Sequence, residues 1–172
     1  MTMASVPTIK SFFRIDKIYF WCFIVIMGLA LALRLTGLGK SIWLDEYITL
    51  KIISGRDLIT QMKVLDIEPP LYFFLLKLWS SMGMKSDYLR LFSVVISLGT
   101  LTMLMLWLKL YSRLASLLTG LLFATLPISL RFSQELRSYP LLLLGTAVSF
   151  FFASQIVYIK KPSEIYPSRE KG

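Results

Sequence analysis

The sequence predicts an all-α, polytopic membrane protein with about four transmembrane helices and two shorter interfacial helices. Hydrophobic residues make up 56% of the 172 residues, and the mean hydropathy is +0.67. Both values exceed those of soluble globular domains. Apolar runs also recur between short basic segments, and the longer runs approach the roughly 20 residues that cross a bilayer as a helix.

The charge pattern favours a membrane over nucleic acid as the partner. The formal net charge is +9, but the basic residues occur singly or in pairs between apolar runs and form no dense basic stripe. Anionic lipid head groups and a lipid-linked phosphate are better counterparts. The chain has one cysteine, Cys22, and no histidine. These residues provide neither a disulfide nor a Cys/His metal centre.

The first span is predicted at 18–38, after a basic N-terminal segment at 1–17. Arg34 lies near the end of this run, where a long cationic side chain can extend to the interface. A cleaved signal peptide is the alternative, because Ala30-Leu31-Ala32 resembles a small-x-small cleavage site. The length of the run and the spans that follow favour a transmembrane helix.

The segment 39–90 mixes polar and apolar residues and is predicted to be an extracytoplasmic loop that does not cross the membrane. The pattern around 48–53 suits a short helix lying along the interface. After Pro69-Pro70, the aromatic-rich run 71–79 is too short to span and predicts a second interfacial or re-entrant helix.

Three further spans are predicted at 91–108, 114–130 and 140–159, followed by a basic tail at 160–172. The four spans and the outer loop together form one transmembrane domain over 18–159. The N-terminus, the turn between the second and third spans and the tail share one side by parity. These segments are basic, so the positive-inside rule makes that side cytoplasmic and predicts a multi-pass protein of the cell membrane.

The same parity brings two polar clusters to the extracytoplasmic face. Asp45 and Glu46 follow the first span, and the cluster 133–139 follows the third, so two crossings separate them. Glu68 lies in the same outer loop. Ionisable residues near a bilayer are often paired or functional, which makes this shared face the candidate site.

Carboxylates facing an arginine suit an anionic lipid-linked group that meets a polar acceptor. Asp45 is predicted to take a proton from the acceptor as general base, and Glu46 is the second catalytic candidate. Arg137 can bind phosphate oxygens in bidentate fashion and stabilise a departing phosphate. The chemistry that combines these roles is glycosyl transfer from a polyprenyl phosphate sugar.

Four motifs, in order, resemble the N-terminal part of the GT-C glycosyltransferases, most closely the branch of protein O-mannosyltransferases and aminoarabinose transferases. They cover nearly the whole chain and are Arg34-Leu35-Thr36-Gly37-Leu38, Ser41-Ile42-Trp43-Leu44-Asp45-Glu46, Glu68-Pro69-Pro70-Leu71-Tyr72-Phe73 and Ser133-Gln134-Glu135-Leu136-Arg137-Ser138-Tyr139. The resemblance implies an inverting transferase with Asp45 as the catalytic residue and two juxtamembrane helices beside it. It also implies that Arg137 contacts the lipid phosphate.

The remaining substrate-binding candidates are Glu68, Gln134 and Tyr139. Many relatives have His-Pro-Pro-Leu where this chain has Glu68-Pro69-Pro70-Leu71, and Glu68 resembles the variant of the aminoarabinose-transferring branch. Glu68 is a candidate to hold the acceptor or a divalent metal. Zinc is not predicted in a chain without histidine, and no cofactor is assigned beyond the lipid donor as substrate.

Simpler interpretations stay open beside these. Asp45 and Glu46 are also suited to the start of a helix, and Arg137 to an interfacial anchor. Members of the resembling family are much longer, so the lone chain is expected to be incomplete as a catalyst. Three explanations are consistent with this expectation: a truncated gene product, a fragment, or a subunit completed by a second chain. The alternative function is a non-catalytic four-span subunit that binds lipid or a partner protein. The sugar and the acceptor (protein, lipid A or cell-wall glycan) are not determined.

Overall fold

The computed structural model describes residues 16–55 and 70–164, with side chains described as far as residue 156. In these ranges the regular structure is entirely helical, which confirms the all-α prediction for the described part of the chain. The helices are α2 (Lys17–Leu35), α3 (Leu44–Ser54), α5 (Pro70–Ser80), α6 (Ser86–Lys109), α7 (Arg113–Thr125), α8 (Pro127–Ser133) and α9 (Tyr139–Glu164).

Three of the described helices, α2, α6 and α9, are long and apolar enough to cross a membrane. The predicted continuous span at 114–130 is instead broken into α7 and α8, which are bent by 62°. Leu126 is extended at the break, immediately before Pro127. Proline disfavours the helical conformation in the residue before it and has no N–H to continue the helix, which explains the break.

Two predicted boundaries also moved. The second span was expected to begin at 91, with Arg90 as the flanking residue before it. Helix α6 instead begins at Ser86 and includes Arg90. Asp87 lies in the first turn of α6, where a carboxylate interacts favourably with the helix dipole. Helix α9 extends to Glu164, beyond the expected end at 159. At the other end of α9, Pro140 is the second residue of the helix, and proline is tolerated in the first turn.

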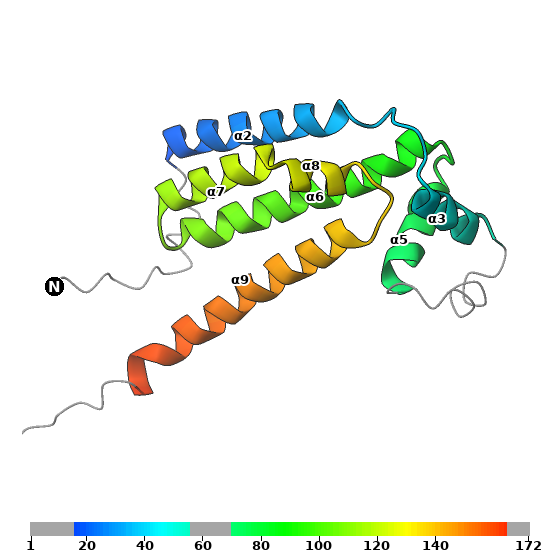
Figure 1. Cartoon of the computed structure of the whole chain (residues 1–172). Helices are drawn as coiled ribbons and strands as arrows, with labels where there is room; N and C mark the ends of the chain where they lie inside the picture. Colours follow the sequence, from blue (N-terminus) through cyan, green and yellow to red (C-terminus); the bar gives the residue numbers. More distant parts are fainter. Residues whose placement is uncertain (1–15, 56–69, 165–172) are drawn as a thin grey trace, which may run out of the picture.

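Helices α2, α6 and α7 lie side by side, and α9 leans against α6 and diverges from the bundle towards its C-terminus (Figure 1). Gly120 allows α7 to approach α6 closely, because a Cβ there would lie 2.7 Å from the sulfur of Met105. The apolar core between α2, α6 and α7 consists of Ile26, Ala30, Leu101, Met105 and Ala124.

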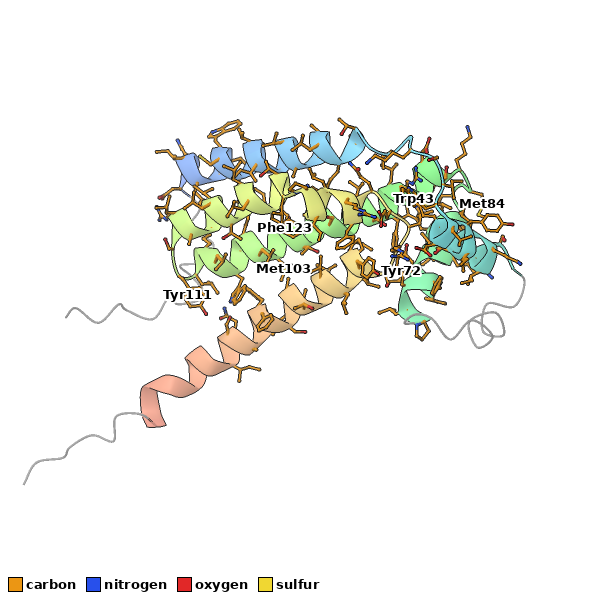
Figure 2. The ribbon with its side chains drawn as sticks, in the orientation of Figure 1. Trp43, Tyr72, Met84, Met103, Tyr111 and Phe123 are labelled. Carbon is orange, nitrogen blue, oxygen red and sulfur yellow. The ribbon has the colours of Figure 1, made fainter. Side chains whose placement is uncertain are left out.

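The short helices α3 and α5 pack at one end of the bundle, where α2 and α8 end and α6 and α9 begin (Figure 1). We call this the head end. Figure 2 shows Trp43 and Tyr72 at the head end and Tyr111 at the opposite end. A second apolar cluster joins α3 and α5 to α6 and consists of Ile52, Ile53, Tyr72, Phe73, Leu76, Leu89, Phe92, Ile96 and Leu136.

Arg34 does not extend to an interface, so that expectation is wrong. Its side chain is fully buried and hydrogen-bonded to the hydroxyls of Ser97 on α6 and Ser129 on α8. Small hydroxyl residues between packed helices offer hydrogen-bond partners inside an otherwise apolar bundle, so the guanidinium is satisfied internally.

Candidate functional site

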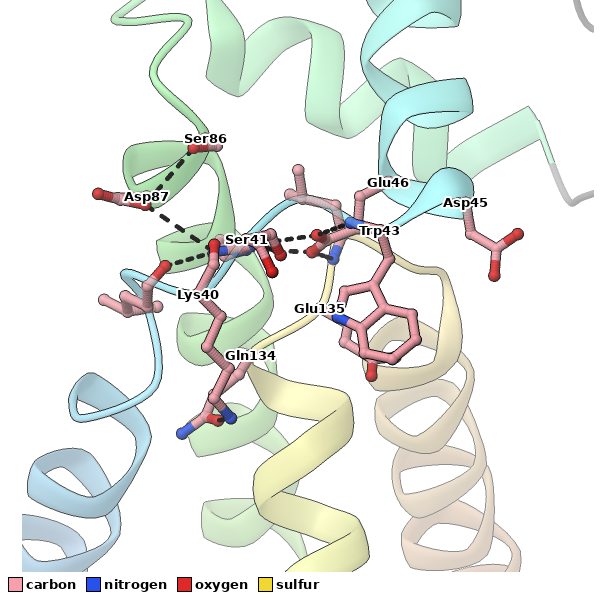
Figure 3. Close-up of polar contacts among 12 residues, drawn as sticks. Lys40, Ser41, Trp43, Asp45, Glu46, Ser86, Asp87, Gln134 and Glu135 are labelled. Carbon is pink, nitrogen blue, oxygen red and sulfur yellow. Dashed lines mark hydrogen bonds and ion pairs between the residues drawn. The ribbon is translucent and has the colours of Figure 1, made fainter.

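The first turn of α3 carries two adjacent carboxylates that face different environments. The side chain of Asp45 is 54% exposed, whereas that of Glu46 is 2% exposed. Successive residues of an α-helix point about 100° apart, so a helix lying on the bundle sends one of them inward and leaves the other outward. Figure 3 shows Glu46 within the polar network and Asp45 pointing away from it.

Glu46 forms a buried ion pair with Arg90, whose side chain is 1% exposed, at 2.6 Å. Arg90 donates five hydrogen bonds, two to the Glu46 carboxylate and three to backbone carbonyls of the linker between α2 and α3. An arginine has five N–H groups, so the donor capacity of Arg90 is fully used. The three linker carbonyls belong to Leu38, Lys40 and Ser41.

Glu46 is equally saturated as an acceptor. Besides Arg90, it accepts from the backbone N–H of Trp43 at 3.3 Å and of Leu136 at 3.0 Å. Burial alone would raise the pKa of Glu46. The hydrogen bonds from Arg90 and Leu136 and the charge of Arg90 together outweigh this effect, so the pKa of Glu46 lies below its ordinary value. This geometry favours a structural role for Glu46; its predicted catalytic role stays a prediction.

Asp45, the exposed carboxylate, contacts the second polar cluster that the sequence predicted on the same face. Arg137 forms an ion pair with Asp45. Arg137 also donates to the Tyr139 hydroxyl at 3.2 Å, and its guanidinium carbon lies 5.3 Å from the centroid of that ring. Asp45 and Arg137 are 92 positions apart in the sequence. Together with Tyr139, these predicted site residues lie in contact at the head end.

Gln134 lies beside this site but is occupied by other contacts. Its side-chain N–H groups donate to the carbonyls of Leu33 and Arg34 at 3.1 and 3.2 Å, and its carbonyl accepts from Lys40 at 2.8 Å. The last carbonyls of a helix have no partner within it, so Gln134 caps the end of α2. A Cβ at Gly37 would lie 2.0 Å from the Gln134 carbonyl oxygen, so this contact requires a glycine.

The backbone of the same segment is fixed by two hydroxyls that sequence analysis missed. Ser93 on α6 donates to the carbonyl of Glu135 at 2.7 Å, and Thr49 on α3 donates to that of Leu136 at 3.2 Å. Together with Glu46, which accepts from the Leu136 N–H, these contacts hold Glu135 and Leu136 against α3 and α6. Hydroxyl residues inside apolar helices were the available signal, although nothing in the sequence indicates their partners.

One cavity begins beside Tyr139, next to the pair of Asp45 and Arg137, and another lies at the pair of Glu46 and Arg90. A groove of about 780 Å³ runs between α5 and α9 and begins beside Tyr139. Its largely apolar lining includes Leu71, Tyr72, Leu141, Leu142, Gly145 and Phe150. A smaller, charged hollow of about 250 Å³ is bounded by Lys40, Trp43, Arg131 and Glu135, with Glu46 and Arg90 also lining it.

Glu68, the remaining predicted site residue, lies outside the described residues. Within the described ranges, no group of three or more His, Cys, Asp or Glu side chains is placed to hold a metal ion. Comparisons with protein-family models, with curated proteins and with solved structures found no match to this chain.

Proposed function

We propose that this chain is a GT-C-type membrane glycosyltransferase, or the N-terminal part of one. It transfers a sugar, with inversion, from a polyprenyl phosphate donor to an acceptor at the extracytoplasmic face. The observation that carries the proposal is the ion pair between Asp45 and Arg137 beside Tyr139. A carboxylate and a guanidinium in contact provide both the proton acceptor and the phosphate-binding group that such a transfer needs.

The groove beside Tyr139 supports a lipid-linked donor. A polyprenyl phosphate combines an anionic head with a long apolar chain, and it needs a cation next to an apolar surface. Arg137 is the cation, and the groove between α5 and α9 is the apolar surface. Arg137 is 28% exposed, so its guanidinium is accessible to a phosphate.

The ion pair also suggests how binding prepares the reaction. A donor phosphate that binds Arg137 competes with Asp45 for the same guanidinium and releases the carboxylate. Asp45 then accepts the proton of the acceptor hydroxyl or amine as that atom bonds to the sugar carbon. The bond from this carbon to the phosphate oxygen breaks, and Arg137 stabilises the negative charge that remains on the phosphate.

The proposed topology has four spans, with the bent pair of α7 and α8 as the third. Helices α3 and α5 are then juxtamembrane helices on the extracytoplasmic side of the cell membrane. This orientation is supported by the basic N-terminal segment, the basic turn at 109–113 and the basic tail, which all belong to the opposite side.

The proposal is tested in membranes that contain the chain and any partner subunit, with a labelled polyprenyl phosphate sugar. Asp45→Asn is expected to lower transfer about a hundredfold or more, since the general base is lost, while donor binding persists because Arg137 is retained. Arg137→Ala is expected to weaken donor binding. Asp16→Asn, which changes an exposed acid paired with Arg113 at the opposite end of the bundle, is the matched control. Undiminished transfer by the Asp45→Asn protein would rule out the assignment.

A non-catalytic subunit that binds lipid or a partner protein is the second candidate function. It is favoured by α9, since only 11% of its membrane-length window is buried within the chain. Such a subunit binds polyprenyl phosphate through Arg137 without sugar transfer in any assembly. Donor binding by the unmodified chain without any sugar transfer would favour this candidate.

A further inference from the structure

Arg34 is a buried cation at the interior of the bundle, near the end of α2. Its guanidinium donates to the Ser97 hydroxyl at 3.0 Å, to the Ala30 carbonyl at 3.1 Å and to the Ser129 hydroxyl at 3.0 Å. None of its hydrogen-bond partners in the described part of the chain is a carboxylate. A charge buried among apolar helices is costly unless dipoles compensate it, so this position calls for a specific explanation.

The break between α7 and α8 provides the explanation. Pro127 has no N–H, so the carbonyl of Phe123, four residues earlier, lacks its helical donor. A carbonyl without a partner is expensive inside a membrane bundle. A guanidinium nitrogen of Arg34 reaches this carbonyl at 3.5 Å, and the guanidinium carbon lies 5.6 Å from the centroid of the Phe123 ring.

The contact is reciprocated at the other end of α8. Gln134, the residue that follows α8, donates to the carbonyls of Leu33 and Arg34 itself. Arg34 on α2 therefore contacts the Phe123 carbonyl that the break leaves without a helical donor. Gln134, after α8, donates to two carbonyls at the end of α2. The direction of α8 is set at both of its ends by contacts with one short stretch of α2.

We propose that Arg34 is the positioning residue that holds the broken third span in its bent form and thereby places the segment 134–139, which carries Arg137. The segment begins where α8 ends, so a change in the direction of α8 pulls Glu135 and Leu136 against their contacts with Ser93 and Thr49 and shifts Arg137 relative to Asp45. The relevance of Arg34 to sugar transfer rests on the proposed function. Its effect on the placement of the segment does not.

The planar fork of arginine is essential to this role. The guanidinium contacts α6 through Ser97 and the two parts of the broken span through Phe123 and Ser129. A lysine ammonium is a compact charge on a flexible stem and lacks this fork. Arg34→Lys therefore retains the charge and is still expected to release α8.

Hydrogen exchange measured by mass spectrometry on the full chain in detergent, without donor lipid, tests the proposal. Arg34→Met is expected to increase exchange of the amides at 130–139 by about tenfold or more, since hydrogen bonds to a charged group are lost. Exchange in α5 is expected to stay unchanged. Arg131→Met, an exposed arginine on α8 itself, is the matched control and is expected to change the rate far less.

One milder variant keeps the test decisive if Arg34→Met does not fold, and two comparisons sharpen the test if it does fold. Ser129→Ala removes one contact of the guanidinium and is expected to give a smaller increase in the same segment. Pro127→Ala supplies an N–H for the Phe123 carbonyl, so Arg34→Met/Pro127→Ala is expected to unfold at a higher temperature than Arg34→Met. A third measurement, on Arg34→Lys, is expected to resemble Arg34→Met rather than the unmodified chain.

The proposal is overturned if exchange at 130–139 is unchanged in these variants, or if it increases equally in α5. An equal increase would mean that Arg34 supports the stability of the whole bundle rather than the placement of one segment. Because the exchange measurement uses no donor or acceptor, the two proposals can fail separately. Loss of protection at 130–139 in Arg34→Met, combined with absent transfer by the assembly that contains the unmodified chain, would reject the glycosyltransferase and retain the role of Arg34.

Discussion

Two ion pairs that begin at neighbouring residues have opposite characters. Glu46 and Arg90 are 2% and 1% exposed, and each is saturated with hydrogen bonds inside the head end. Asp45 and Arg137 are 54% and 28% exposed and lie beside the groove. The first pair has no capacity left for a substrate, whereas the second can exchange partners. A single step along α3, a rotation of about 100°, thus separates a structural carboxylate from one available for chemistry.

The physical difference lies in what each pair loses when one partner is removed. Removing a partner of a buried pair leaves an uncompensated charge, which costs several kcal/mol. An exposed charge that loses its partner is solvated by water, so exposed pairs contribute little to stability. Four measurements sharpen or break this comparison, beginning with the largest expected effect.

Arg90→Met is expected to lower the free energy of unfolding by about 3–5 kcal/mol, because Glu46 is left buried without its counter-charge. Thermal or denaturant unfolding of the detergent-solubilised chain measures the change. Arg113→Met removes the exposed pair with Asp16 and is the control, with an expected cost of at most about 1 kcal/mol. Equal losses in the two variants would contradict the assignment of Glu46 and Arg90 as the structural pair.

Acidification is expected to weaken the buried pair. The pKa of Glu46 is lowered in the folded chain from its ordinary value of 4.5, so the folded state binds this proton less readily than the unfolded state. The resulting stabilisation is present above about pH 4.5 and is lost as the pH falls through the folded value. Unfolding midpoints measured across this range should depend less on pH in Glu46→Gln, and an unchanged pH dependence would contradict the role of Glu46.

Gly37→Ala is expected to cost about 1–3 kcal/mol, because the new methyl group displaces the Gln134 amide from its hydrogen bonds to the end of α2. Gly39→Ala is the matched control, since nothing lies within 4 Å of a Cβ at that position. The two unfolding midpoints can be compared under identical conditions. Similar midpoints would show that the contact of Gln134 with α2 contributes little.

Arg137→Met is expected to change the free energy of unfolding by at most about 1 kcal/mol, because the exposed pair with Asp45 is weakly stabilising. Binding of polyprenyl phosphate in nanodiscs is expected to fall nevertheless, since the phosphate loses its cation. Lys51→Met on α3 is a control for the removal of a head-end cation. A large loss of stability in Arg137→Met would place Arg137 with the structural residues instead.

Much of the fold was predictable because hydrophobic periodicity and run length are local properties. The apolar runs that became α2, α6 and α9 were recognised, and short helices were expected where α3 and α5 form. The broken third span was not predicted. Pro127 was noticed only as lying near the end of the run, although its effect on Leu126 follows from local sterics.

The candidate site was predictable only in part. Asp45, Arg137 and Tyr139 were expected on one face and are in contact. The partner of Glu46 was missed, since Arg90 was interpreted as the boundary of a span. Gln134 was expected to bind substrate, but its hydrogen bonds are directed to α2. In both cases the residue type was informative, whereas its direction depended on the packing of a helix more than 40 positions away.

The sequence by itself determined which segments are helical and apolar, because helix formation and transfer out of water depend on residues within a single run. Only the tertiary structure decided which charges are buried. Asp45 and Glu46 are adjacent acids with nearly the same chemistry, and the bundle covers one of them and leaves the other exposed. That choice arises from how α3 packs against α5 and contacts Arg90 on α6 and Leu136 in the segment before α9. The free energy of a charge depends on what surrounds it in space.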